Sequence, residues 1–181
     1  MMSAADYDLM ERTYKAGQGN FGKIEPPKRD MVATDGQKLT LGSTTITPYI
    51  TPGHTPGTIS IILPVTDNGA PHLVSFWGGT AFPATLEATP ANGGMSGYET
   101  SIKRFTKVAM DADVDTALSN HPELDGTLEN IEKVKTRKPG DPNPWVLGQS
   151  AYLRYMDVIH NFVGAGKTLA REKAAAAKPT N

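Results

Sequence analysis

Thr51-Pro52-Gly53-His54-Thr55-Pro56-Gly57-Thr58 is the stretch of the chain that decides its fold: one histidine framed by two Pro-Gly turns. Residues 44–50 alternate apolar with polar side chains before it, and residues 59–65 are almost continuously apolar after it. These patterns predict a strand on each side of a turn. The glycines give the backbone conformations that are closed to other residues and the prolines fix φ, so His54 is predicted to be held stiffly, pointing into a cleft. Local chemistry leaves open a second interpretation, in which His54 is an exposed residue of an ordinary turn.

A second segment agrees with the first. Ser119-Asn120-His121-Pro122 follows the strand-like residues 115–118. Together, the two segments resemble the metallo-β-lactamase superfamily. The first is similar to its Gly-His-Thr-Pro-Gly segment, and the second to the place of its last zinc-binding histidine. Residues 123–127 (Glu-Leu-Asp-Gly-Thr) and 143–148 (Asn-Pro-Trp-Val-Leu-Gly) resemble the histidine-rich branch of the family, whose zinc sites lack cysteine. The resemblance covers residues 1 to about 165 of the chain.

This resemblance implies a fold, a cofactor and an activity. The fold is an αββα sandwich, and His54 and His121 are zinc ligands that serve different ions. In the complete relatives, zinc lowers the pKa of a bound water, and the resulting hydroxide attacks the amide or ester carbonyl of a small-molecule substrate. The resemblance therefore implies a zinc-dependent hydrolase.

The family's His-x-His-x-Asp-His signature is absent from the chain. The only histidines are His54, His72, His121 and His160, and no two lie within five residues of each other. Met1–Asp6 resembles the family's sequence just after the helix that follows that motif. The chain is therefore interpreted as a C-terminal portion, in which each zinc ion would keep one of its usual ligands. The alternative is a non-catalytic, metal-free remnant of the fold that associates with itself.

Composition restricts the class of protein. The 181 residues fit a single domain, with residues 166–181 expected to form a frayed tail. The net charge of −1 gives no attraction to nucleic acid or to an anionic membrane, and no apolar run is long enough to span a bilayer. No signal peptide is visible, although related full-length enzymes are often periplasmic or secreted, so the compartment stays undetermined. With no cysteine, disulfides and cysteine ligands are excluded.

Periodicity predicts an α/β (α+β) chain. It corresponds to the C-terminal αβ half of the sandwich, with a mainly antiparallel sheet and the helices outside it. We expect helices at 4–14, 98–110, 123–137 and 150–178, strands at 31–33, 38–41, 44–50, 58–65, 73–77 and 115–119, and a long irregular region at 80–97. Strands 59–65 and 73–77 are too apolar for one face of the sheet to lie in water. That face must be covered by a helix of the chain itself, by a missing N-terminal half or by a second copy of the chain, and we expect a homo-oligomer or the missing half.

The other candidate residues are weaker. His72 is expected at a strand edge and His160 in helix packing, and Asp113 with Asp115 is expected to solvate a helix-to-strand turn rather than to form an acid/base pair. Gly78-Gly79-Thr80 is expected to be a turn near the site. Tyr98, Trp145 and Tyr152 are candidates for a substrate wall, although aromatic residues near helix starts are usually packed. Catalytic and substrate-binding residues are not assigned.

Overall fold

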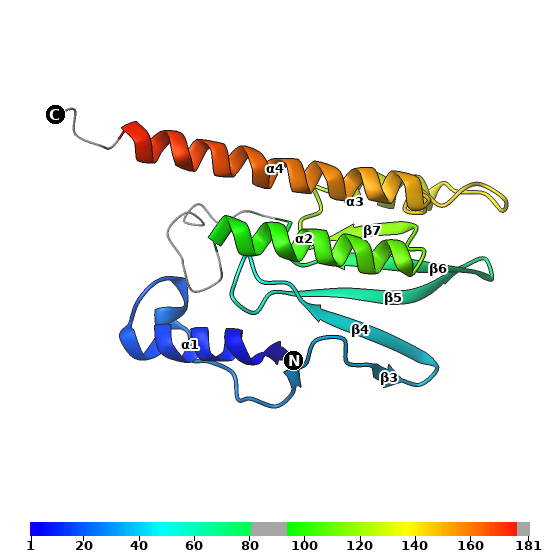
Figure 1. Cartoon of the computed structure of the whole chain (residues 1–181). Coiled ribbons are helices and arrows are strands. Elements are labelled where there is room, and N and C mark those ends of the chain that lie inside the picture. Colours follow the sequence, from blue (N-terminus) through cyan, green and yellow to red (C-terminus); the bar gives the residue numbers. More distant parts are fainter. Residues whose placement is uncertain (81–93, 177–181) are drawn as a thin grey trace.

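The sheet and its helices form layers in the computed structural model, which describes residues 1–80 and 94–176 (Figure 1). The elements in chain order are β1 (Met2–Ser3), α1 (Ala4–Ala16), η1 (Asn20–Lys23), β2 (Val32–Ala33), β3 (Leu39–Leu41), β4 (Thr44–Ile50), β5 (Ile59–Asp67), β6 (Ala70–Trp77), α2 (Gly94–Asp111), β7 (Thr116–Ser119), α3 (Thr127–Lys135) and α4 (Gln149–Ala176). The predicted α+β class with a mainly antiparallel sheet is confirmed.

The main sheet has the strand order β3-β4-β5-β6-β7. The first three pairings are antiparallel, and β7 joins β6 in parallel. The tight turn between β5 and β6 is closed by Asn68 and Gly69, whose φ angles of 48° and 86° are both positive, as a primed hairpin turn requires. The prolines in β4 and β5, Pro48 and Pro64, lie where their strand has a ladder partner on only one side, so the missing N–H costs no ladder bond.

One face of this sheet carries the core. Trp77 of β6, Ile62 of β5 and Ala117 of β7 pack there against α2 and α4. The helices contribute buried residues at helical spacing: Tyr98, Ile102, Phe105 and Ala109 from α2, and Tyr152, Met156, Ile159 and Val163 from α4. The Trp77 and Tyr98 rings meet edge to face with 6.0 Å between centroids, a geometry worth about 0.5–1.5 kcal/mol beyond burial.

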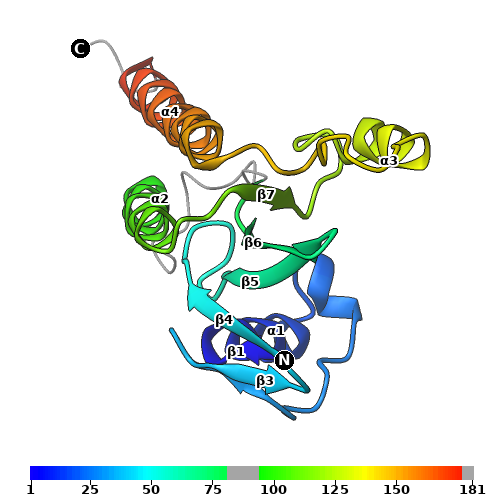
Figure 2. The ribbon, with the colours of Figure 1, turned by 90° about the vertical axis from the view of Figure 1, so that its right-hand side faces the viewer.

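The opposite face of the sheet is less well covered. The register places Ile61, Leu63 and Val65 of β5 on this face, beside Val74 and Phe76 of β6. Val74 is buried, but Ile61, Leu63 and Phe76 are only half-buried and Val65 is 37% exposed. Helix α1 lies on this side, opposite α2 and α4 (Figure 2). The sheet therefore has one dry face and one partly open face.

Three expectations about elements need correction. The helix predicted at 123–137 begins only at Thr127, because residues 121–126 form a turn. The strands predicted at 31–33 and 38–41 do not pair with each other: β2 pairs with β1, and β3 pairs with β4. Helix α2 begins at Gly94, inside the region expected to be irregular, while residues 81–93 of that region lie outside the described residues. Within the described residues, no helix is long and apolar enough to cross a membrane.

Helices α2 and α4 are also joined by one carboxylate. Glu99 of α2 accepts hydrogen bonds from Lys103 (2.6 Å) and from Lys167 of α4, and its Oε1 lies 3.4 Å from Nε2 of His160 of α4. The Lys103 hydrogen bond, followed by those of Lys167 and His160, lowers the pKa of Glu99 from its ordinary 4.5 to about 2.

This lowered pKa predicts a pH-dependent contribution to stability. Because the folded-state pKa lies below the unfolded value, the stabilisation is complete above pH 4.5 and is lost as the pH falls towards 2. Glu99→Gln should therefore lower the free energy of unfolding at pH 7, and the difference from wild type should shrink between pH 4.5 and 3. Urea titrations at several pH values measure this. Glu132→Gln, in an exposed pair with Lys135, is the control. A difference independent of pH would contradict the prediction.

Candidate functional site

Three strands end at the same edge of the sheet. Because β4 and β6 are each antiparallel to β5, and β7 is parallel to β6, the strands β4, β6 and β7 all run in one direction. Their carboxyl ends are followed by His54, by Gly78-Gly79-Thr80 and by His121, respectively. The structure thus places both predicted metal ligands in loops at one edge. That they bind metal stays a prediction.

The His54 loop is closed by its own polar groups. The Thr51 N–H donates to the Thr58 carbonyl (2.8 Å), and the Thr55 N–H donates to Thr58 Oγ1 (2.8 Å). Below the loop, the buried hydroxyls of Thr51 and Ser60 lie 2.8 Å apart, and Ser60 Oγ also accepts the Gly78 N–H (3.1 Å). The loop after β4 is therefore tied to the end of β6.

The two glycines of this loop are required for space. Neither Gly53 nor Gly57 has a φ in the left-handed region, so the prediction that they supply conformations closed to other residues is wrong. A Cβ on Gly53 would lie 2.3 Å from Cδ2 of Tyr98, and one on Gly57 would lie 1.7 Å from Oγ of Ser3. The loop packs directly against α2 on one side and against the start of α1 on the other.

Asp6 makes the contact between α1 and this loop. Its Oδ2 accepts the Thr55 hydroxyl and its Oδ1 accepts the Gly57 N–H, each at 2.9 Å. Burial raises the pKa of Asp6, while the hydrogen bonds from Thr55 and Gly57 and the attraction to His54 oppose that rise. Asp6 was not among the predicted site residues. The available signal was the Ser3-x-x-Asp6 pattern, which predicts a helix start but not a contact 49 residues away.

The His121 loop is organised by Asp125. Its two carboxylate oxygens accept the N–H groups of Ser119 (2.8 Å) and Thr127 (2.9 Å), so one side chain joins the end of β7 to the start of α3. The His121 N–H donates to Ser119 Oγ (3.0 Å), and the ring Nδ1 lies 3.2 Å from Oε1 of Glu123. The His121 side chain is 37% exposed. It is accessible to a ligand at this edge.

The predicted aromatic candidates separate into two groups. Tyr98 and Tyr152 are fully buried core residues, and burial raises the pKa of both phenols. Trp145 instead lines a small cavity of about 160 Å³ between β7, α3 and α4, together with Ala117, Leu124, Asp125, Asn130, Leu147 and Tyr155. Of the three, only Trp145 stands beside open space near the His121 loop.

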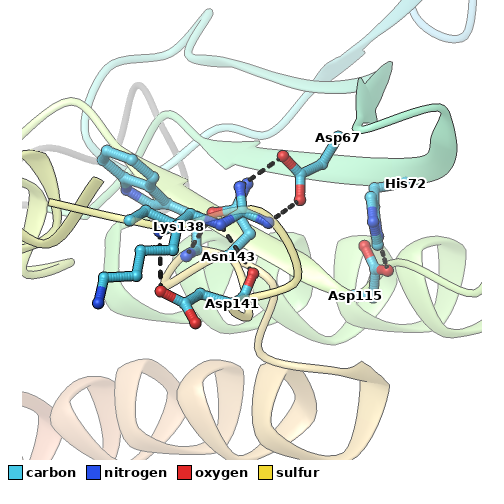
Figure 3. A network of polar contacts seen from close by, with 8 residues as sticks. Asp67, His72, Asp115, Lys138, Asp141 and Asn143 are labelled. Atoms are coloured by element: carbon cyan, nitrogen blue, oxygen red, sulfur yellow. Dashed lines mark hydrogen bonds and ion pairs between the residues drawn. The ribbon is translucent and has the colours of Figure 1, made fainter. Parts of the chain in front are cut away.

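His72 and His160 lie away from this edge. His72 is near the beginning of β6, where its Nδ1 is 2.5 Å from Oδ2 of Asp115 (Figure 3), and His160 is beside Glu99. Asp113 accepts a hydrogen bond from Gln149 (2.9 Å) rather than facing Asp115. These two carboxylates bind different partners, as the expectation of a structural role requires.

The polar network in Figure 3 holds the chain between α3 and α4 against the β5–β6 hairpin. Arg137 donates to both oxygens of Asp67 (2.7 and 2.6 Å), and its Nε donates to the Asp141 carbonyl (2.8 Å). The Asp67 contact lowers the carboxyl pKa below its ordinary range. The network lies at the strand ends opposite to His54 and His121, so it supports the frame rather than the candidate site.

The ligand chemistry fits zinc only in part. Neutral imidazoles such as those of His54 and His121 are good zinc ligands, but a catalytic zinc ordinarily has three protein ligands. In residues 1–80 and 94–176, no group of three or more His, Cys, Asp or Glu side chains is arranged to hold a metal ion. The described residues therefore do not complete a zinc site by themselves.

Similarity of this chain to known proteins is found among solved structures. No family model and no curated protein matches the chain. Among solved structures, it is similar to a subclass B3 metallo-β-lactamase of Bradyrhizobium japonicum, with a TM-score of 0.71 and 26% identity over 97% of this chain. It is also similar to the metallo-β-lactamases of Legionella gormanii (TM-score 0.73, 19% identity, 94% of this chain) and Elizabethkingia meningoseptica (TM-score 0.65, 23% identity, 95% of this chain).

The similarity extends over only part of each of these enzymes. The chain spans 64%, 65% and 62% of the lengths of the three enzymes, in the order named. Because it covers 94–97% of this chain, the match takes in the sheet and the helices α2 and α4 on its core face. The chain carries a partial metallo-β-lactamase fold, of the kind found in subclass B3.

Proposed function

We propose that this chain supplies His54 and His121 to a zinc-dependent hydrolase centre whose remaining ligands come from polypeptide outside these 181 residues. The observation that carries the proposal is the arrangement of the sheet, because both histidines follow strands that end at one edge. The similarity to zinc-type β-lactamases that are longer than this chain supports the same conclusion. In such a centre, bound zinc supplies an activated water for attack on a carbonyl group.

The described residues would hold the ligands rather than perform the chemistry. Ser60, Thr58 and Asp6 fix the His54 loop, and Asp125 fixes the His121 loop. With the rest of the site present, the substrate would be a small molecule with an amide or ester carbonyl, and a β-lactam is the first to test. The walls that select the substrate include residues outside the chain.

The four histidines allow a direct test of this assignment. Zn²⁺ added to the purified chain should shift the ring signals of His54 and His121 in a ¹H–¹³C spectrum. Both histidines lie in loops at the edge of the sheet where β4 and β7 end, which is where the metal would bind. The signals of His72 and His160 should stay in place, since these two residues lie away from the edge that carries His54 and His121. His54→Ala and His121→Ala should each remove one responding signal, with His72→Gln as the matched control. Shifts confined to His72 or His160, or no shift at all, would contradict the assignment.

A second candidate function is a metal-free module that associates with itself. Two observations favour it: the absence of a three-ligand group in the described residues, and apolar surface left uncovered. Besides the partly open sheet face, α3 stands apart from α2 and α4 (Figure 2) and exposes Leu128 (65%), Ile131 (39%) and Val134 (38%). Surface of this kind is typical of an interface.

Self-association can be measured independently of zinc. If the module associates through its apolar surface, light scattering should give a mass above that of one chain, unchanged by a chelator. Leu128→Glu should reduce that mass if α3 takes part, and Glu129→Gln, on the same helix, should not. A single monomeric species at all concentrations, with no copurified peptide, would contradict this candidate.

A further inference from the structure

The first turn of α1 lies against the His54 loop, and the contact is specific. Ser3 caps the helix by accepting the Asp6 N–H on its Oγ (3.2 Å). An acid three residues after such a cap ordinarily reaches back to the backbone of the cap residue. The Asp6 carboxylate instead reaches across to Thr55 and Gly57, 49 and 51 residues away.

The surrounding structure fixes this contact from both sides. The N-terminal residues are held by the parallel pairing of β1 with β2 and by the Met2 N–H, which donates to the Met31 carbonyl (3.2 Å). On the loop side, the absent side chain of Gly57 lets its backbone approach Ser3 and Asp6, because a Cβ there would lie 2.8 Å from Oδ1 of Asp6. The carboxylate therefore lies where the start of α1 and the His54 loop meet, and it accepts hydrogen bonds from the loop.

His54 lies next to one of the two groups that Asp6 binds and three residues from the other. Thr55 follows it directly, and Gly57 comes two residues later. These contacts hold the backbone just after His54. Where a histidine binds metal, loss of a group that orients it ordinarily lowers metal affinity by about 10- to 100-fold.

We propose that Asp6 is the positioning residue of His54: its carboxylate fixes the backbone on the carboxyl side of the histidine and so sets where the ring points. The inference adds to the proposed function and rests on it in one respect, namely that His54 is a zinc ligand. The clamp itself is a property of the metal-free chain. It also gives α1 a role beyond covering the sheet, because it makes the loop geometry depend on the first six residues.

The metal-free test compares Asp6→Ala and Asp6→Asn with wild type. Asp6→Ala should abolish the hydrogen-exchange protection of the Gly57 amide and shift the His54 ring signal, while the other three histidine signals stay in place. Asp6→Asn keeps a neutral acceptor for Gly57 and should restore part of the protection. Thr55→Val removes the contact with Asp6, together with the contact between the Thr55 and Thr58 hydroxyls, without touching α1, and it should shift His54 in the same direction. Asp8→Asn, on the same helix but paired with Arg29, is the control.

Repeating these measurements with Zn²⁺ distinguishes a failure of this inference from a failure of the proposed function. If both hold, Asp6→Ala should weaken the Zn²⁺ response of His54 by about tenfold or more and leave that of His121 unchanged. If wild type shows no Zn²⁺ response, the proposed function fails, and the Gly57 and His54 readouts still decide the clamp. An unchanged Gly57 exchange rate and an unchanged His54 signal in Asp6→Ala would overturn the inference.

Discussion

The parallel pairing of β7 with β6 is the constraint on which the candidate site depends. A parallel partner cannot follow through a tight turn, so the chain must cross over the sheet before it returns. Helix α2 is in that crossover, and with α4 it buries the core face around Trp77 and Phe105. The return in parallel brings His121 to the same edge as His54. An antiparallel β7 would have placed His121 at the opposite edge, beside the Asp67–Arg137 network.

The two histidine loops at this edge are held by carboxylate hydrogen bonds. Asp125, in the turn after β7, joins the end of β7 to the start of α3, and Asp6 fixes the loop after β4 from the start of α1. In each case one carboxylate accepts two donors, an arrangement that strengthens both hydrogen bonds because the acceptor is charged. The loops that carry both histidines are therefore fixed to the sheet and its helices, and within the described residues no group of three or more metal-ligating side chains is found.

Much of this frame could be predicted from local sequence. The Asn68-Gly69 turn, the apolar strands beside it and the histidine segments after β4 and β7 each carry a strong short-range signal, and the resemblance they support is confirmed by the solved structures. The helix predicted from residue 123 failed because the Asp125 contacts hold residues 121–126 in a turn. The predicted role of the loop glycines was wrong for a related reason. Positions 53 and 57 require glycine because Tyr98 and Ser3, which are distant in sequence, leave no space for a side chain. The periodicity of a sequence indicates local backbone geometry and cannot indicate close approaches between residues that are distant in the chain.

The central claim is that this chain holds two ligands of a zinc centre and not a complete one. Zinc content after equilibrium dialysis tests it most directly, with free Zn²⁺ buffered at about 1 nM, where retention requires a binding free energy of about −12 kcal/mol. We expect substantially less than one zinc per chain, because a single histidine per ion cannot supply that energy. Retention of one or more zinc ions per chain, lost in His54→Ala or His121→Ala, would contradict the claim and show that the chain completes the centre itself.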